Sequence, residues 1–183
     1  MFRKFYITQG DYYFEFGSHE ANSMRMAWDC FQYLFKWDFI AFDSFEGLPD
    51  MEDYDRSTIF VKGNLATAED EFIHRVTSHG MPRDRLITVK GFYDTSLTEE
   101  LRERLLPKKA AVIYIDCDLY KSTVPVLEFI LPFLQLGTVI VFDDWNCYHA
   151  QPDYGERKAW KEFLNIHQYL KFESFVSTSE AMS

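Results

Sequence analysis

Carboxylate side chains follow two apolar stretches of this sequence, at the point where each stretch ends. Residues 111–115 form an apolar, β-rich run that leads to Asp116. A second such run, residues 138–142, leads to Asp143 and Asp144. Three like charges at one site are costly unless protons or a cation offset them, and Mg²⁺ prefers oxygen ligands. If the fold gathers them, these aspartates predict a magnesium site; otherwise they are turn-forming or helix-capping residues at strand ends.

The segment between the two runs has the pattern of a helix that crosses from one strand to the next. Ser122 and Thr123 open this helix, and Pro125 stands in its predicted first turn. Its apolar face is broad and consists of Val126, Leu127, Phe129, Ile130, Phe133 and Leu134. A strand–helix–strand unit makes the strands parallel, so both end at the edge where open α/β sheets bind ligands. The three aspartates are therefore predicted to meet.

The rest of the chain also alternates short strands with amphipathic helices. Thr67 and Asp70 resemble a capping box that opens one of these helices. Strands are predicted at residues 11–16, 38–42, 86–89, 111–115 and 138–142, helices at 24–35, 67–80, 98–106, 122–134 and 159–164, and a last strand-like piece near 172–176. This order predicts an α/β fold with a doubly wound, mostly parallel, Rossmann-like sheet and helices on both of its faces. The C-terminal hairpin is predicted to be shortened. Residues 1–183 are predicted to form one domain.

Composition limits the partners and the compartment. The net charge of -10 argues against a nucleic-acid backbone or an anionic membrane surface as the main partner. The three cysteines lack C-x-x-C spacing, which indicates neither a disulfide framework nor a zinc site. No apolar run approaches the roughly 20 residues of a membrane span, and no signal-peptide core follows the N-terminus. We expect a cytoplasmic protein.

The turn after the first strand limits the choice of cofactor. It has the single glycine Gly17 where a dinucleotide fingerprint needs three, and the sequence has no Walker A motif. An adenosine ligand without phosphates needs the backbone to approach it closely at one point only, here at Gly17. It also needs a carboxylate, such as that of Asp43, to accept hydrogen bonds from its ribose hydroxyls. S-adenosylmethionine (SAM) is such a ligand, and its positive sulfonium suits an acidic pocket. We therefore expect SAM at this strand edge.

Three stretches carry a family resemblance. D-S-F-E-G-L-P occupies residues 43–49, D-x-D-L-Y-x-S-T occupies residues 116–123, and the Asp doublet stands at 143–144. Together with residues 90–95 and 155–159, they resemble the macrocin O-methyltransferase family, Mg²⁺- and SAM-dependent enzymes that methylate sugar hydroxyls of macrolide antibiotics. The resemblance spans most of the chain, and it implies the same fold, cofactor and metal here.

The strand ends and the resemblance assign the site residues. Glu15 is expected to orient the methionine amino group or the turn itself. The adenine is expected to lie near Phe92, with Asp94 accepting from its amine; alternatively, Phe92 packs in the core and Asp94 caps the next helix. The predicted cofactor-binding residues are Glu15, Gly17, Asp43, Ser44, Gly91, Phe92, Asp94 and Asp116. The predicted metal ligands are Asp116, Asp143 and Asp144. The catalytic candidates are Asp116, Asp118 and His149.

The predicted function is a SAM-dependent, Mg²⁺-assisted O-methyltransferase acting on a hydroxyl of a small molecule, such as a sugar or a glycosylated natural product. The turn after the first strand departs from the family, because Ala21 and Asn22 replace a second glycine. Two other functions stay open: a SAM-binding or partner-binding domain without turnover, and an unrelated α/β metal-dependent hydrolase. A homodimer is an open alternative to a monomer.

Overall fold

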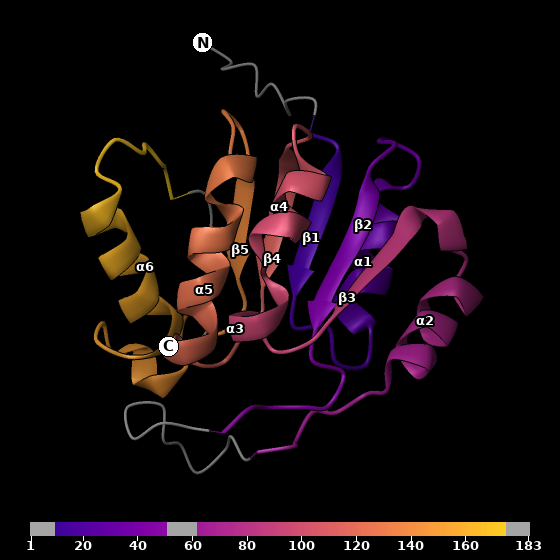
Figure 1. The fold of residues 1–183 in the computed structure, drawn as a ribbon, viewed down its shortest axis with the longest axis horizontal. Coiled ribbons are helices and arrows are strands. Elements are labelled where there is room, and N and C mark those ends of the chain that lie inside the picture. The colour runs from indigo at the N-terminus through magenta and orange to yellow at the C-terminus, as the bar shows by residue number, and fades with distance from the viewer. Residues whose placement is uncertain (1–9, 51–61, 175–183) are drawn as a thin grey trace, which may run out of the picture.

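A five-stranded parallel sheet with helices on both faces forms the body of the computed structural model, which describes residues 10–50 and 62–174 (Figure 1). The strands are β1 (Tyr12–Phe16), β2 (Asp38–Asp43), β3 (Leu86–Lys90), β4 (Ala110–Ile115) and β5 (Val139–Phe142). They lie in the order β3-β2-β1-β4-β5, and every neighbouring pair is parallel. The predicted doubly wound α/β fold is confirmed.

The helices pack in two groups on the two faces of the sheet. One face carries α1 (Asn22–Phe31) and α2 (Glu69–Ser78). The other carries α4 (Glu99–Leu105), α5 (Tyr120–Ile130) and α6 (Gly155–Ile166). The short helical turns are α3 (Tyr93–Ser96), η2 (Arg83–Arg85), η3 (Leu131–Phe133) and η4 (Tyr148–Ala150). Because both faces of the central strands are covered, those strands read as continuous apolar runs.

Aromatic side chains hold the central strand in place. All five residues of β1 are buried. The ring of Phe16 stacks on that of Phe42 in β2, with centroids 4.4 Å apart, and Phe14 meets Phe133 edge-on at 5.2 Å. Such ring pairs add about 0.5–1.5 kcal/mol each beyond the burial of their area. The turn that follows Phe16 therefore leaves the sheet from a firmly packed strand.

The crossover helix α5 begins earlier than the sequence predicts. The carbonyl of Leu119 accepts hydrogen bonds from the amides of Ser122 and Thr123, so the first helical residue is Tyr120. Pro125 consequently lies inside the helix and not in its first turn. Proline has no N–H to donate, so one helical hydrogen bond is missing there. The early start places the first helical residue two positions after Asp118.

Two other helix ends differ from the predictions. Ala68 is the N-cap of α2 and no side chain caps it, so the predicted capping box of Thr67 and Asp70 is wrong. Thr67 is instead buried. Acidic residues in the first turn, Glu69, Asp70 and Glu71, complement the positive end of the helix dipole.

The first helix, α1, ends at Phe31, although the apolar spacing continues to Phe35. The ring of Phe35 stacks on that of Trp37 at 4.2 Å in the turn to β2. The apolar pattern continues past the helix because these rings pack together, and periodicity alone does not reveal where the backbone leaves the helix.

After α6 the chain forms no further strand within the described residues. Residues 171–174 have no regular secondary structure, and the ring of Phe172 packs against Trp160 at 5.4 Å instead of extending the sheet. The rest of the strand-like piece predicted near 172–176 lies outside the described residues. Of the helices in the described ranges, none has both the length and the apolar character that a membrane span requires.

Candidate functional site

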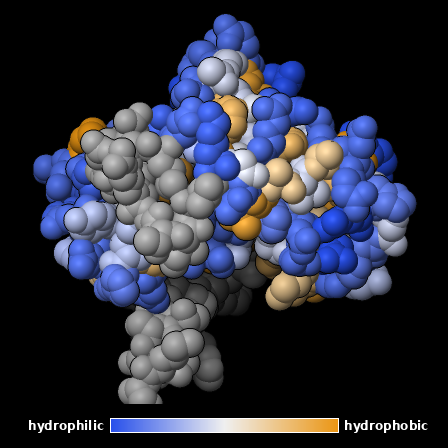
Figure 2. Space-filling view, turned by 90° about the horizontal axis from the view of Figure 1, so that it is seen from below, coloured by the Kyte–Doolittle hydropathy of each residue, from blue (hydrophilic) through white to orange (hydrophobic). Residues whose placement is uncertain are grey.

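The carboxyl ends of the strands meet at the lower edge of the sheet in Figure 1, where the outgoing loops enclose a cavity of about 540 Å³. β1 and β4 are neighbours, but their following helices, α1 and α5, cover opposite faces. The chain diverges there, which is where open α/β sheets bind ligands. Figure 2 views the molecule from this side, with hydrophilic residues around a smaller hydrophobic area. The cavity walls include Gly17, Asp43, Ser44, Gly91, Phe92, Asp94, Asp116, Asp118, Asp143 and Asp144.

Gly17 makes the first turn of the cavity wall possible. Its φ is +85°, and a Cβ atom built on it would lie 1.8 Å from the carbonyl oxygen of Asp116. The amide of Gly17 donates to Phe42 in β2, and the amide of Asp116 donates to Phe16. Glycine is therefore required by the close approach of β1 to the end of β4, before any ligand is considered.

Asp43 ties the loops after β1 and β2 together. Its Oδ2 accepts hydrogen bonds from the amide of Ser18 at 2.7 Å and of His19 at 3.4 Å, and its Oδ1 accepts from the amide of Phe45 at 2.7 Å. A carboxylate oxygen has two lone pairs, so Oδ1 can still accept a hydrogen bond from a ligand. The side chain has a structural task and spare capacity for a ribose hydroxyl.

The loop after β3 turns into the short helix α3, which begins at Tyr93. Phe92 is 36% exposed, so its alternative place in the core is wrong. Asp94 does not cap α4: the hydroxyl of Thr98 accepts a hydrogen bond from the amide of Leu101 there. Phe92 and Asp94 both line the cavity, as an adenine wall would.

Glu15 is absent from the walls of the cavity. It is fully buried, and it accepts hydrogen bonds from the hydroxyls of Tyr13 at 2.8 Å and Ser23 at 3.2 Å. Burial raises the pKa of Glu15 to about 8, although these hydroxyls act in the opposite direction. In this arrangement Glu15 supports the turn and does not reach the cavity.

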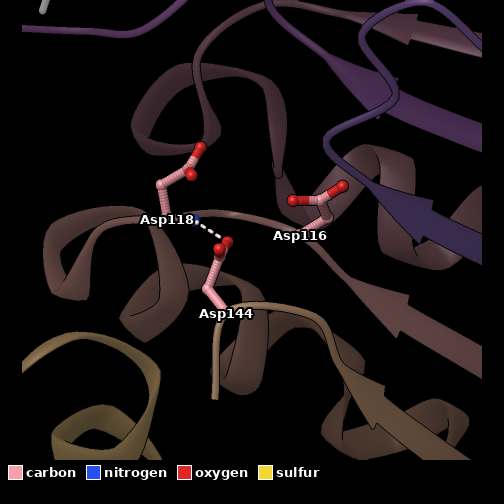
Figure 3. Close-up of side chains that lie close together, drawn as sticks. All are labelled: Asp116, Asp118 and Asp144. Atoms are coloured by element: carbon pink, nitrogen blue, oxygen red, sulfur yellow. Dashed lines mark hydrogen bonds between the residues drawn. The ribbon is translucent and has the colours of Figure 1, made fainter. Parts of the chain in front are cut away.

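Three aspartates converge on one side of the cavity (Figure 3). One carboxylate oxygen each of Asp116, Asp118 and Asp144 lies within 4.8 Å of the other two. We call this group the aspartate triad. Asp118 adopts a left-handed backbone with φ of 59°, which side chains rarely occupy. That conformation turns the chain between β4 and α5.

Asp144 is held from two sides. Its Oδ2 accepts a hydrogen bond of 3.0 Å from the amide of Asp118, and its Oδ1 accepts one of 3.2 Å from the thiol of Cys147. Burial raises the pKa of that thiol to about 12, so Cys147 stays a donor and is a poor nucleophile. The carboxylate orientation at the end of β5 is therefore fixed before any ion binds.

Burial and neighbouring charges raise the pKa values of two triad residues, Asp116 and Asp118. Burial is the largest cause that raises the pKa of Asp116 to about 8, followed by the charges of Asp144 and Asp143. Burial and Asp144 also raise the pKa of Asp118 to about 8. A divalent cation would offset these like charges, so the triad has the electrostatics of a cation site.

Two predicted residues lie apart from the triad. Asp143 lines the cavity, but its Oδ1 accepts a hydrogen bond of 2.5 Å from the hydroxyl of Tyr114, and Asp118 takes its place among the clustered carboxylates. His149 is exposed in a left-handed turn, with φ of 58°, and does not line the cavity. His19 does line it, with its Nδ1 2.8 Å from the carbonyl oxygen of Leu65.

Sequence reasoning missed the buried carboxyl of Glu156. It is 1% exposed at the start of α6, and neither oxygen has a hydrogen-bond partner of good geometry among the described residues. Burial raises its pKa to about 9, followed by the charges of Asp144, Asp116 and Asp118. An orphaned buried carboxyl beside the triad is a sign of an ion or water there. The signal in the sequence is an acid directly after Gly155, within the stretch 155–159 that resembles the family.

Comparison with solved structures defines the class of fold. The calicheamicin methyltransferase CalS11 matches with a TM-score of 0.68 and 21% identity, over 90% of this chain and 68% of that one. The O-methyltransferase NovP matches with a TM-score of 0.68 and 21% identity, over 87% of this chain and 64% of that one. The fold is thus that of these Rossmann-like methyltransferases.

Sequence comparison then gives the family. The model of the macrocin-O-methyltransferase (TylF) family matches residues 35–171, so the chain belongs to that family, as the resemblance predicted. A curated relative from Streptomyces olivaceus, 8-demethyl-8-(2,3-dimethoxy-alpha-L-rhamnosyl)-tetracenomycin-C 4'-O-methyltransferase, is 32% identical over 63% of this chain. The chain spans 46% of that relative's length.

Proposed function

We propose that this protein is a SAM-dependent O-methyltransferase that acts on a hydroxyl of a small molecule. One observation carries the proposal: a single cavity is lined both by the strand-end residues suited to an adenosine and by the aspartate triad. Membership of the macrocin O-methyltransferase family supports the same reaction and gives no support to an unrelated hydrolase.

The proposed cofactor position follows the strand ends. Phe92 would offer its exposed ring to the adenine, and Asp43 would accept from the ribose hydroxyls through Oδ1. The sulfonium would then lie towards Asp116, where acidic side chains favour its positive charge. Ser44 and Gly91 line the same part of the cavity.

The triad residues fit a Mg²⁺ ion. Their oxygens are close enough to share one cation, burial and the charge of Asp144 raise the pKa values of Asp116 and Asp118, and the orphaned Glu156 lies beside them. Asp116, Asp118 and Asp144 would therefore hold the ion, and the predicted ligand Asp143 lines the cavity beside them. When bound, Mg²⁺ supplies a positive charge that lowers the pKa of an acceptor hydroxyl and orients its oxygen.

The chain's own residues would position the acceptor and receive its proton. Asp118 lines the cavity at the triad, and a carboxylate oxygen not engaged elsewhere can accept the proton of the reacting hydroxyl. His149, which does not line the cavity, is not part of this proposal. Most of the rate enhancement would come from positioning and from fixed charge.

A sugar hydroxyl is the acceptor class that we favour. The tetracenomycin relative is named for 4'-O-methylation of a rhamnosyl derivative, and it shares 32% of its residues with this chain over the aligned part. The cavity walls combine carboxylates and hydroxyls with small apolar groups such as Leu48 and Pro49, as a hydroxylated ring would need.

Calorimetry with S-adenosylhomocysteine, followed by transfer assays on a panel of rhamnosylated small molecules, tests the proposal. We expect binding of the cofactor product, and Mg²⁺-dependent formation of a methylated sugar that chelator abolishes. Cofactor binding without transfer to any acceptor would favour a binding domain without turnover. No binding of S-adenosylhomocysteine would contradict the proposal itself.

A further inference from the structure

The sheet face that carries α1 is covered over only part of its width. The ring of Trp28 in α1 packs against Phe39 of β2, with centroids 5.5 Å apart, and Asp29 of α1 lies 2.8 Å from His79 at the end of α2. Figure 1 shows both helices on the side of β2 and β3, away from β5. Among the helices of residues 10–50 and 62–174, none packs over β5 on this face. The outer part of the face is therefore open.

The strands at this open part carry apolar side chains. β4 and β5 pair with Val112 opposite Val139 and Tyr114 opposite Val141. The residues that alternate with them pack in the core beneath α5, so these four side chains lie on the α1 side of the sheet. Val139 is 47% exposed and Val141 is 37% exposed, whereas the strands of a parallel sheet are normally buried on both faces. We call these four residues the open floor.

Beside the open floor, α1 presents a second apolar surface. Met26, Cys30 and Tyr33 recur at i, i+4 and i+7, so they lie along one side of the helix and of the turn that continues it. The buried residues of α1 are on its other side, towards the sheet. Met26 is 68% exposed, Tyr33 is 88% exposed, and Cys30 is exposed as well. We call these three residues the α1 stripe, which faces outward next to the open floor.

The α1 stripe and the open floor have complementary shapes. An α-helix with its side chains is about 10–12 Å in diameter, so the sheet is lower than α1 by roughly one helix where no helix covers it. A ridge and a hollow of equal depth thus lie side by side on one face. A two-fold axis brings the same patch of both subunits together. We propose that two copies of this chain associate about such an axis, with the α1 stripe of each copy packed on the open floor of the other.

Charge also favours a second copy as the partner. A two-fold interface places identical surfaces against each other, so charges within it would meet charges of the same sign. The chain has a net charge of -10, yet every residue of the α1 stripe and of the open floor is uncharged. Two copies can therefore approach each other here without repulsion between the contacting side chains. A different partner would match one of the two surfaces, whereas a second copy buries both at once.

Analytical ultracentrifugation of the full chain, without ligand, tests the association. We expect a dimer for the wild type. Val141→Asp in the open floor and Met26→Glu in the α1 stripe should each weaken dimerisation by at least about 30-fold, as at an interface hot spot. Met26→Glu alters an exposed helical position, so the fold should persist, and circular dichroism checks this. Ile166→Glu, at a 70% exposed position at the end of α6, is the matched control and should keep the dimer.

Disulfide trapping tests the arrangement within the dimer. In the proposed dimer Cys30 of one copy lies near the open floor of the other, and Cys117 is buried. Oxidation should therefore give covalent dimers in Val139→Cys, in Val141→Cys, or in both. The same variants should lose these dimers when Cys30→Ser is added. Ile166→Cys should give no dimer that depends on Cys30.

Three results would overturn this inference. The first is a wild-type protein that stays monomeric up to about 100 μM, since standard interfaces associate far below that concentration. If a spin label on Phe2→Cys, with Cys30→Ser, broadens the NMR signals of Val139 and Val141 in such a monomer, residues 1–9 of the same chain cover the open floor instead. The second is a dimer that persists in Val141→Asp or in Met26→Glu. The third is a dimer that forms no Cys30-dependent disulfide at either position of the open floor.

Discussion

The backbone amide of Asp118 donates a hydrogen bond of 3.0 Å to the carboxylate of Asp144, which joins the loop after β4 to the loop after β5 (Figure 3). The contact brings together residues that are far apart in the sequence, and it forms while both carboxylates remain near Asp116. The loops therefore hold like charges together through a neutral backbone donor. This relationship explains why the triad is both strained by repulsion and well placed for a cation.

Replacing Asp144 by Asn should remove the cation site without unfolding the protein. The Asn oxygen can still accept from the amide of Asp118, whereas one charge of the triad is lost. We expect the Mg²⁺ affinity to fall at least ten-fold, because loss of a residue that only supports a metal ligand already has an effect of that size. The metal-free variant should be as stable as the metal-free wild type or more stable, because one like charge has been removed. Thermal unfolding with and without Mg²⁺ measures both, because a bound ion raises the midpoint.

Asp153→Asn is the control for this substitution, because Asp153 is exposed and, in the part of the chain that the structure describes, forms an ion pair with the exposed Lys161. It should retain the Mg²⁺-dependent shift of the unfolding midpoint. A wild-type shift in Asp144→Asn would mean that Asp144 does not bind the ion.

Gly17→Ala should destabilise the whole fold and not merely weaken cofactor binding. The added Cβ would lie 1.8 Å from the backbone oxygen of Asp116, and backbone cannot move away as a flexible side chain would. We expect a loss of more than about 2 kcal/mol in the free energy of unfolding, measured by urea denaturation.

Gly63→Ala separates the clash from the backbone strain. Gly63 has a similar φ of +77°, but a Cβ there meets nothing within 4 Å. Its cost should be about 1–2 kcal/mol, the penalty of a left-handed residue alone. Equal losses in the two variants would argue against the close approach of β1 to the end of β4.

The sequence predicted the fold because its local and global signals agree. The strands are apolar runs that the sheet buries, and the helices between them carry one apolar face each, so alternation alone indicated a doubly wound sheet. Gly17 and Asp43 stand at the ends of adjacent strands, where topology places a ligand site, and both line the cavity. The structure adds a second reason for a glycine at position 17, because the end of β4 lies where a Cβ atom would stand.

The composition of the triad could not be predicted in the same way. Asp118 enters it through a left-handed backbone that no local pattern signals, and Asp143 accepts a hydrogen bond from the hydroxyl of Tyr114. Glu156 comes from a helix distant in the sequence and is buried by tertiary packing. Each of these depends on contacts between segments, which a single sequence does not display.

Phe92→Ala should weaken cofactor binding with little effect on stability. The ring is 36% exposed at the cavity wall, so truncation removes little core packing. Loss of an aromatic wall beside adenine should cost about 0.5–1.5 kcal/mol, or roughly two- to ten-fold in affinity for S-adenosylhomocysteine by calorimetry. Phe172→Ala, at a 58% exposed position on the chain after α6, is the control. Equal affinities in both variants would place the adenine elsewhere.

The stability of the metal-free and cofactor-free protein should fall as the pH rises from about 4.5 to about 8, because of Glu15. Burial raises the pKa of this carboxyl from 4.5 to about 8 in the folded state. Below pH 4.5 Glu15 is protonated in both the folded and the unfolded state. Between pH 4.5 and about 8 Glu15 ionises in the unfolded chain but keeps its proton in the folded protein. The unfolded state is therefore favoured progressively, by up to roughly 4–5 kcal/mol above the folded pKa.

Urea denaturation at pH 5 and at pH 8, in excess chelator, measures this loss directly. Glu15→Gln should lose less stability between the two pH values than the wild type, because its amide does not titrate. Some loss should remain in that variant, since burial also raises the pKa values of Asp116, Asp118 and Glu156. Glu103→Gln, on the exposed side of α4, should behave as the wild type does. A wild-type stability that is constant or rises over this range would show that Glu15 is ionised in the folded protein.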